Sequence, residues 1–169
     1  MADRFTTGIR IGGKVKRALI PGLIQAINAE QLQQEWGKAL PEIATEDQLL
    51  SHRNEKGALW FCNEEQAWGR FEELEEFLVE KGIQFDREHG PRYETDGELA
   101  LFRPGMKEPR YCVADASGAL TVAVEKIQKI RDLLKRNPAK TGVQRALRAL
   151  NALCEDADVE LLPRFEIVE

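Results

Sequence analysis

The stretch from residue 58 to residue 85 constrains the fold of this chain more than any other. Its apolar run ALWFCN, bounded by Gly57 and Asn63, is typical of a strand. The next segment, GRFEELEEFLVEKG, carries apolar side chains at helical spacing on one face: Phe71, Leu74, Phe77 and Leu78. Gly82 is a typical helix stop, and extended sequence resumes at once with IQF. We therefore predict a strand–helix–strand unit, and a fold that combines a sheet with helices.

The N-terminal segment predicts another strand followed by a helix. Apolar and polar residues alternate in FTTGIRI, which indicates a half-buried strand that ends at Gly12 and Gly13. The sequence LIPGLIQAINAEQLQQEWG then predicts a helix that stops at Gly37. Leu23, Ile27 and Leu32 can share one face of this helix, and Trp36 lies four residues beyond Leu32.

The middle of the chain predicts a short helix, a hairpin and one ambiguous segment. Thr45, with Gln48 three residues later, is expected to form the capping box of a helix that runs through Leu50. ELALFR and RYCVA alternate as strands and are joined by the turn sequence PGMKEP, so we expect a hairpin. Residues 117–125 fit strand and helix alike. Helical spacing runs unbroken from Leu120 to Leu134, which favours a helix from about Leu120.

The C-terminal part predicts a last helix and a terminal extended segment. Thr141 is expected to cap the helix. Its inner face is predicted to consist of Val143, Leu147, Leu150 and Cys154. In VELLPRFEIVE, Pro163 limits the extended segment to an edge strand, a bulge or a loose arm.

Together these elements predict an α+β fold with an antiparallel or mixed sheet, helices packed on one face, and a C-terminal helix pair. The length of 169 residues is typical of one domain with a small appendage. We expect residues 1–116 to form the sheet domain. Residues 117–169 are expected to form the helix pair and terminal extended segment, packed on the same core.

The cysteine pattern and the apolar runs predict a soluble cytoplasmic protein. The three cysteines, Cys62, Cys112 and Cys154, are widely spaced and form no CxxC pair, so no zinc ribbon or dithiol redox site is indicated. No run reaches the roughly 18 apolar residues of a membrane helix, and the first residues lack the pattern of a signal peptide. We expect no membrane association, no metal and no cofactor.

One segment, IQFDREHG, places acids, a base and an imidazole together and is the best candidate for chemistry. Asp86, Glu88 and His89 form this polar cluster. Strand alternation puts His89 on the core side with Arg87, whereas Asp86 and Glu88 point to the opposite side. A catalytic thiol from Cys62 is conceivable but less expected than a buried structural cysteine. An exposed strand end therefore remains the preferred interpretation over an active site.

Charge is divided unevenly along the chain. Residues 60–100 carry twelve acidic and four basic side chains, a net of −8, and residues 119–150 carry eight basic and two acidic ones, a net of +6. The acidic helix offers Glu72, Glu73 and Glu76 to a basic partner. The basic helices offer Lys140, Arg145 and Arg148 to an acidic partner or to phosphates.

These features predict a small non-catalytic interaction protein that binds another macromolecule, expected to be a protein, through charge-complementary surfaces. The alternative is a nucleic-acid-associated protein that uses the basic C-terminal helices. A third possibility is an enzyme of unrecognised class centred on residues 86–89. The chain is expected to be a monomer or a homodimer. RFEIVE either pairs in trans with a second copy or closes the sheet of its own chain.

Overall fold

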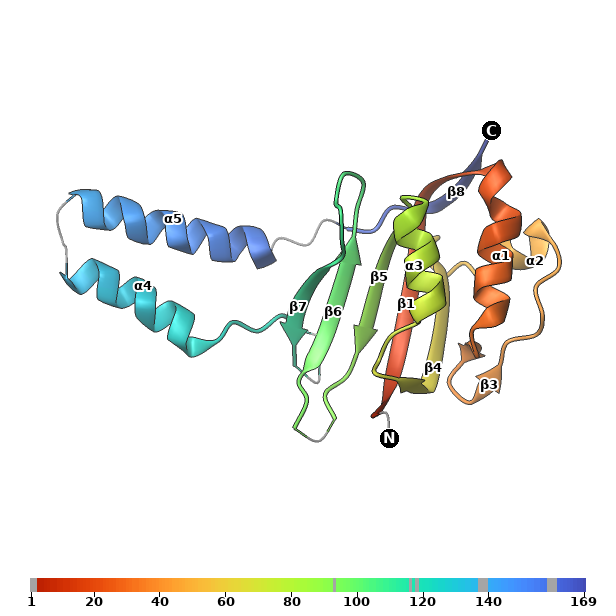
Figure 1. Ribbon diagram of the computed structural model, residues 1–169, viewed down its shortest axis with the longest axis horizontal. Helices are drawn as coiled ribbons and strands as arrows, with labels where there is room; N and C mark the ends of the chain where they lie inside the picture. The colour runs from red at the N-terminus through yellow and green to blue at the C-terminus, as the bar shows by residue number, and fades with distance from the viewer. Residues whose placement is uncertain (1–2, 93, 116, 118, 137–139, 158–160) are drawn as a thin grey trace.

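A computed structural model describes residues 3–92, 94–115, 117, 119–136, 140–157 and 161–169 (Figure 1). Within these residues the strands are β1 (Arg4–Lys16), β2 (Gln33–Glu35), β3 (Lys38–Ala39), β4 (Leu59–Ala67), β5 (Gln84–His89), β6 (Gly97–Phe102), β7 (Arg110–Ala114) and β8 (Phe165–Val168). The helices are α1 (Ile20–Ala29), preceded by the 3-10 turn η1 (Arg17–Leu19), α2 (Glu46–Leu50), α3 (Glu72–Glu80), α4 (Val124–Arg136) and α5 (Lys140–Ala157).

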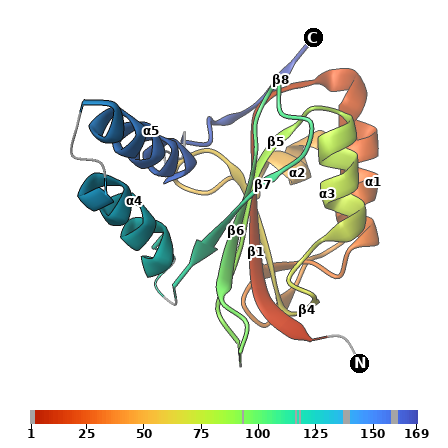
Figure 2. The ribbon, with the colours of Figure 1, turned by 60° about the vertical axis from the view of Figure 1, so that its left-hand side comes forward.

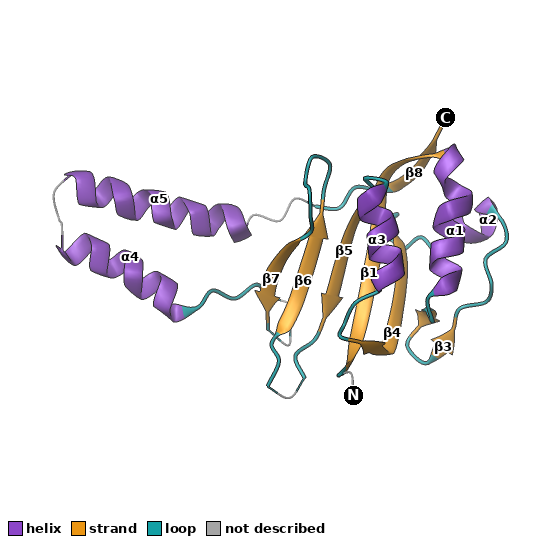
Figure 3. Ribbon diagram, in the orientation of Figure 1, coloured by secondary structure: helices purple, strands orange, loops and turns teal. Residues whose placement is uncertain are grey.

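The strands form one sheet in the order β3-β2-β4-β1-β5-β6-β7, and neighbours along this path are antiparallel (Figure 3). The exception is β8, which pairs in parallel with the last residues of β1, Gly13 to Lys16. The structure thus confirms the predicted α+β fold. The terminal segment closes the sheet of its own chain.

β1 is longer than the alternation predicts, because Gly13 turns the strand without ending it. This residue has a φ of 83°, in the left-handed region that glycine adopts at little cost. Its N–H donates to the carbonyl oxygens of Pro163 at 3.2 Å and Arg164 at 3.0 Å. Beyond that bend the strand continues along β8. The prediction that Gly12 and Gly13 end the strand is therefore wrong.

The helix predicted to reach Gly37 ends at Ala29, and a small β2–β3 hairpin replaces its second half. Tertiary partners explain the change. The Asn63 amide donates to the Gln31 carbonyl at 2.7 Å, and Gln33 pairs with Cys62 of β4. These contacts hold residues 31–35 in an extended form, since tertiary pairing overrides a modest helical preference.

The hydrophobic core lies between the sheet and the helices α1 and α3. Both helices pack on the same face of the sheet, as Figure 2 shows. The sheet contributes Ile9, Ile11, Phe61 and Phe85, and α1 contributes Leu23 and Ile27, all fully buried. The predicted apolar face of α3 packs here through Leu74 and Leu78. The predicted capping box of α2 is present, with the Thr45 side chain accepting from the Gln48 N–H at 3.2 Å.

The C-terminal helices form an antiparallel pair, which we call the α4–α5 hairpin. The hairpin extends beyond β7 and lies on the other side of the sheet from α1 and α3 (Figures 1 and 2). Leu120 forms a bridge with Ala114 beside β7, and the helix starts only at Val124. The ambiguous segment therefore contains both conformations, and the predicted start near Leu120 is four residues too early.

Burial within the hairpin differs from the expected inner face. Gly142 and Ala146 of α5 are buried, whereas Val143, Leu147 and Leu150 are exposed by 39%, 52% and 47%. The buried line of α5 thus runs through the small residues Gly142 and Ala146, and the larger side chains lie away from it. The fourth predicted inner residue, Cys154, has a side chain outside the described part of the structure.

The hairpin and the terminal strand differ in their relation to the core. Phe165 of β8 is buried in the main hydrophobic cluster. Among the described residues of α4 and α5, none belongs to that cluster. The division of the chain at residue 116 remains a prediction. Within the described ranges, no helix has the length and apolar character needed to cross a membrane.

Candidate functional site

β5 splits the polar cluster between the two faces of the sheet, as strand alternation predicts. Asp86 and Glu88 lie on the open face, which points away from α1 and α3. Arg87 and His89 lie on the covered face, where the His89 ring is 4.6 Å from the Phe5 ring, centroid to centroid. The acids and the imidazole therefore do not converge, although they are neighbours in sequence.

Each acidic side chain of the cluster forms an ion pair with an arginine. An oxygen of Asp86 lies 2.7 Å from Nη1 of Arg103, and both side chains are largely buried. Oε2 of Glu88 lies 2.7 Å from Nη2 of Arg10 in a more exposed pair. These pairs engage both carboxylates with guanidinium groups, which suits a structural role on the sheet better than proton transfer.

Arg87 is the centre of a buried network that sequence reasoning missed. Its side chain is fully buried, with Nε 3.1 Å from Oε1 of Glu75 on α3 and Nη2 2.6 Å from Oε1 of Glu98 on β6. Burial raises the pKa of Glu75, and the Arg87 charge opposes that rise. Glu75 belongs to the acidic helix α3, and its pairing with Arg87 joins that helix to the sheet.

Cys62 does not supply a reactive thiol in this structure. Burial raises the pKa of the thiol to about 11, and the carboxylates of Glu64 and Glu35 add to the effect. Its Sγ donates to the Gln33 carbonyl at 3.6 Å. Within the described ranges, no group of three or more His, Cys, Asp or Glu side chains is arranged to hold a metal ion.

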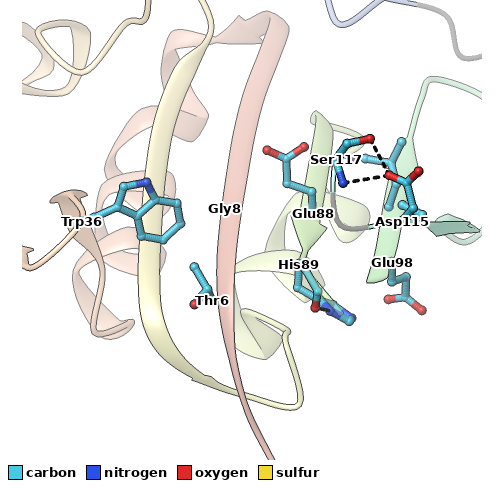
Figure 4. Close-up of a pocket in the computed structure, with 11 residues that line it drawn as sticks. Thr6, Gly8, Trp36, Glu88, His89, Glu98, Asp115 and Ser117 are labelled. Carbon is cyan, nitrogen blue, oxygen red and sulfur yellow. Dashed lines mark hydrogen bonds between the residues drawn. The ribbon is translucent and has the colours of Figure 1, made fainter. Parts of the chain in front are cut away.

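The open face of the sheet carries a hollow of about 250 Å³ (Figure 4). Trp36 forms one wall, half-exposed and packed edge-on against Trp60 with 6.3 Å between the ring centroids. Gly8 makes room for this pair, because a Cβ at that position would lie 2.2 Å from the Trp60 ring. The wall opposite includes Asp115, whose Oδ1 accepts from the Ser117 backbone at 2.8 Å and hydroxyl at 2.6 Å.

The polar groups around this hollow are engaged with one another. Hydrogen bonds from Ser117 and Ala119 hold the pKa of Asp115 below its usual value. Glu88 is paired with Arg10, and Glu98 with Arg87. The hollow therefore offers an aromatic wall and few uncommitted polar groups, which makes it a weak ligand site.

The acidic residues predicted on α3 form an exposed face. Glu72, Glu73 and Glu76 are all exposed. Glu72 and Glu76 border a hollow of about 380 Å³ beside Tyr111, where the Arg70 guanidinium carbon lies 5.1 Å from the ring centroid. The structure thus places these glutamates together, on the side of the sheet that carries α1 and α3.

The basic residues predicted in the C-terminal helices are brought together only in part. Arg145 and Arg148 are exposed on α5, on the side turned away from its large apolar residues. The side chain of Lys140 lies outside the described part of the structure. No aromatic side chain lies between the described bases of α4 and α5 for a nucleobase to stack on.

The hairpin also presents an apolar face that was not predicted. It consists of five aliphatic side chains, exposed by 39% to 55%: Ile127, Leu134, Val143, Leu147 and Leu150. Leu133, exposed by 40%, lies on the other side of α4. Measured from half-buried Ile130 on α4 and from the buried line of Gly142 and Ala146 on α5, the five residues lie about 40° to 120° further round the helix in the same rotational sense. Because the helices are antiparallel, that sense brings both sets to one side of the pair. We call this surface the apolar face of the hairpin.

One signal in the sequence pointed to this surface. The apolar arc of each C-terminal helix is wider than a single neighbouring helix covers, so that some of its larger aliphatic side chains remain exposed. Comparison of the chain with protein-family models, with curated proteins and with solved structures gives no match. The function must therefore be inferred from the geometry of these surfaces.

Proposed function

We propose that this chain is a non-catalytic interaction protein that binds another protein through the α4–α5 hairpin. The observation that carries the proposal is the apolar face, five half-exposed aliphatic side chains on one side of a projecting helix pair. Contiguous apolar surface of this kind marks interaction sites, because covering it removes that surface from water. The proposal keeps the cytoplasmic location that the sequence predicts.

Charge around the hairpin adds selectivity. Arg131 and Lys135 are exposed on α4 at the border of the apolar face. Rim charges of this kind affect the rate and the selectivity of binding and contribute less to affinity than the apolar centre. On the other side of the sheet, Glu72, Glu73 and Glu76 form a second, acidic surface suited to a basic partner.

Nucleic acid is the second candidate partner, supported by the exposed and adjacent Arg145 and Arg148. Phosphate binding would use the side of α5 opposite the apolar face and would leave the aliphatic residues uncovered. A protein partner accounts for that uncovered surface, and we therefore prefer it. An enzyme centred on residues 86–89 is less supported, because the acids are paired with arginines and His89 lies on the other face.

The test is an affinity capture from the lysate of the native host with the full chain and matched variants. The double variant Leu147→Glu/Leu150→Glu places charges on the apolar face. Ala152→Glu, a control on the same helix, changes an exposed alanine on the opposite side. Arg145→Glu/Arg148→Glu tests nucleic acid, and Glu73→Lys/Glu76→Lys tests the acidic surface.

We expect a protein that the unmodified chain and Ala152→Glu capture equally, and that the apolar-face variant loses. Circular dichroism must show that all variants keep their helices. Capture of nucleic acid that salt elutes and Arg145→Glu/Arg148→Glu abolishes would support the alternative instead. Equal capture by the apolar-face variant and the control would contradict the proposal. Loss in Glu73→Lys/Glu76→Lys alone would move the docking surface to α3.

A further inference from the structure

Among the residues that the structure describes, the open face of the sheet offers no matching cover for the apolar face of the hairpin. On the open face of the sheet, the side toward which the hairpin lies, ion pairs join Arg10 to Glu88 and Arg103 to Asp86. Folding the hairpin back would place aliphatic side chains against these charges and exclude the water that hydrates the exposed pair. The chemistry that matches the face best is therefore another helical apolar face.

We infer that the apolar face is covered by the same face of a second copy, so that two hairpins form a four-helix bundle. The inference rests on the proposed docking function and names the occupant of that face. In a two-fold arrangement with the axis along the helices, α4 lies over α5 of the second copy. Every neighbouring pair in the bundle is then antiparallel, as in up-and-down bundles.

The size of the face is consistent with a dimer interface. α4 has 13 residues and is therefore about 20 Å long, and two helices side by side are about 20 Å wide. The outline of the face is roughly 400 Å² per copy, and its corrugated accessible area is larger. Two copies thus reach the order of 1,000 Å² that separates specific interfaces from incidental contacts.

The charges on the hairpin permit this pairing. Lys129, Arg145 and Arg148 lie on the sides turned away from the apolar face. Only Arg131 and Lys135 border the face on α4, and the two-fold arrangement places them beside the uncharged edge of α5 from the second copy. That edge carries Gln144 and Asn151. Salt therefore screens a weak repulsion and strengthens the dimer slightly.

The experiment is sedimentation equilibrium of the purified full chain over a wide concentration range, at low and at high salt. We expect a monomer–dimer equilibrium that high salt does not dissociate. Leu147→Glu should raise the dissociation constant about a hundredfold, because the substitution occurs twice in each dimer and each carboxylate contributes about a tenfold loss. Ala152→Glu, which introduces the same charge on the other side of α5, should leave it unchanged.

Several outcomes would overturn the dimer. They are a chain that stays monomeric at all concentrations, a dimer that salt dissociates, and an equal effect of Leu147→Glu and Ala152→Glu. A monomeric chain whose capture of another protein is lost in Leu147→Glu/Leu150→Glu would overturn the dimer and leave the proposed docking function in place. A dimer that Leu147→Glu weakens, from a chain that captures no other protein, would support self-association and limit the function to it.

Discussion

Nε of Arg87 on β5 lies 3.1 Å from Oε1 of Glu75 on α3, and both side chains are withdrawn from water. The same guanidinium reaches Glu98 on β6 at 2.6 Å, so one cation joins a helix and two strands. Removing charges from water is costly, and such a cluster is maintained only when its members pair with one another. The network therefore fixes α3 on the sheet.

Arg87→Met is expected to lower the free energy of unfolding by about 3–5 kcal/mol, because it leaves Glu75 buried without its cation. Arg10→Met removes an arginine from a more exposed pair with Glu88 and should cost at most about 1 kcal/mol. Urea unfolding followed by circular dichroism measures both. Similar losses of stability in the two variants would show that the buried network stabilises the protein no more than the exposed ion pair does.

The loss of stability caused by Arg87→Met is expected to depend on pH. Burial already raises the pKa of Glu75 from its ordinary value of 4.5, and loss of Arg87 raises it further. A carboxyl with a raised folded-state pKa contributes stability at low pH that is lost as the pH rises through that pKa. The difference in the free energy of unfolding between the variant and the unmodified chain should therefore be largest at neutral pH and decrease on acidification. A difference that increases on acidification would contradict the assignment of this effect to Glu75.

Gly8→Ala is expected to destabilise the protein by about 1–3 kcal/mol, because the new Cβ would lie 2.2 Å from the Trp60 ring. Displacement of Trp60 should also shift the tryptophan fluorescence. Gly90→Ala is the matched control, since nothing lies within 4 Å of a Cβ at that position. A stable Gly8→Ala variant with unchanged fluorescence would show that Trp60 does not lie across β1 as described.

Cys62 should resist alkylation in the folded protein, because burial and a thiol pKa of about 11 leave about one molecule in a thousand as thiolate near pH 8. Cys112, which is partly exposed, should react faster. Site-resolved mass spectrometry after a short iodoacetamide pulse separates the two residues. In denaturant, Cys62 should react as fast as Cys112. Equal labelling of both sites in the folded protein would contradict the burial of Cys62.

Phe165→Ala is expected to destabilise the chain by about 3–5 kcal/mol, because the ring is buried in the core although it lies four residues from the C-terminus. Glu166→Ala, an exposed neighbour on β8, should change stability by less than about 0.5 kcal/mol. Thermal unfolding measures both. A silent Phe165→Ala would mean that the terminal strand does not close the sheet of its own chain.

Local signals in the sequence predicted several elements well. The apolar spacing and terminal glycine of α3, the capping box of Thr45 and Gln48, and the β6–β7 hairpin all depend on residues close in sequence. Strand alternation also predicted that Asp86 and Glu88 would point away from His89. Each of these features depends on residues close together in the chain, so the sequence alone is enough to predict it.

The errors arose where a distant partner decided the outcome. Residues 31–35 leave the helical conformation because Asn63 and Cys62 of β4 bind them. Glu75 is buried because Arg87, twelve positions later, reaches it from another element. The inner face of α5 was misplaced because the buried line of this helix runs through Gly142 and Ala146.

The sequence by itself determined the α+β class, most helices and strands, and the sides on which the residues of β5 point. These follow from periodicity and turn chemistry, which act locally. Only the tertiary structure decided that Arg87 joins α3 to the sheet, that Trp60 lies across Gly8, and that the hairpin leaves its larger aliphatic side chains uncovered. Packing depends on which surfaces meet, and a helical pattern shows that a face is apolar without showing what covers it.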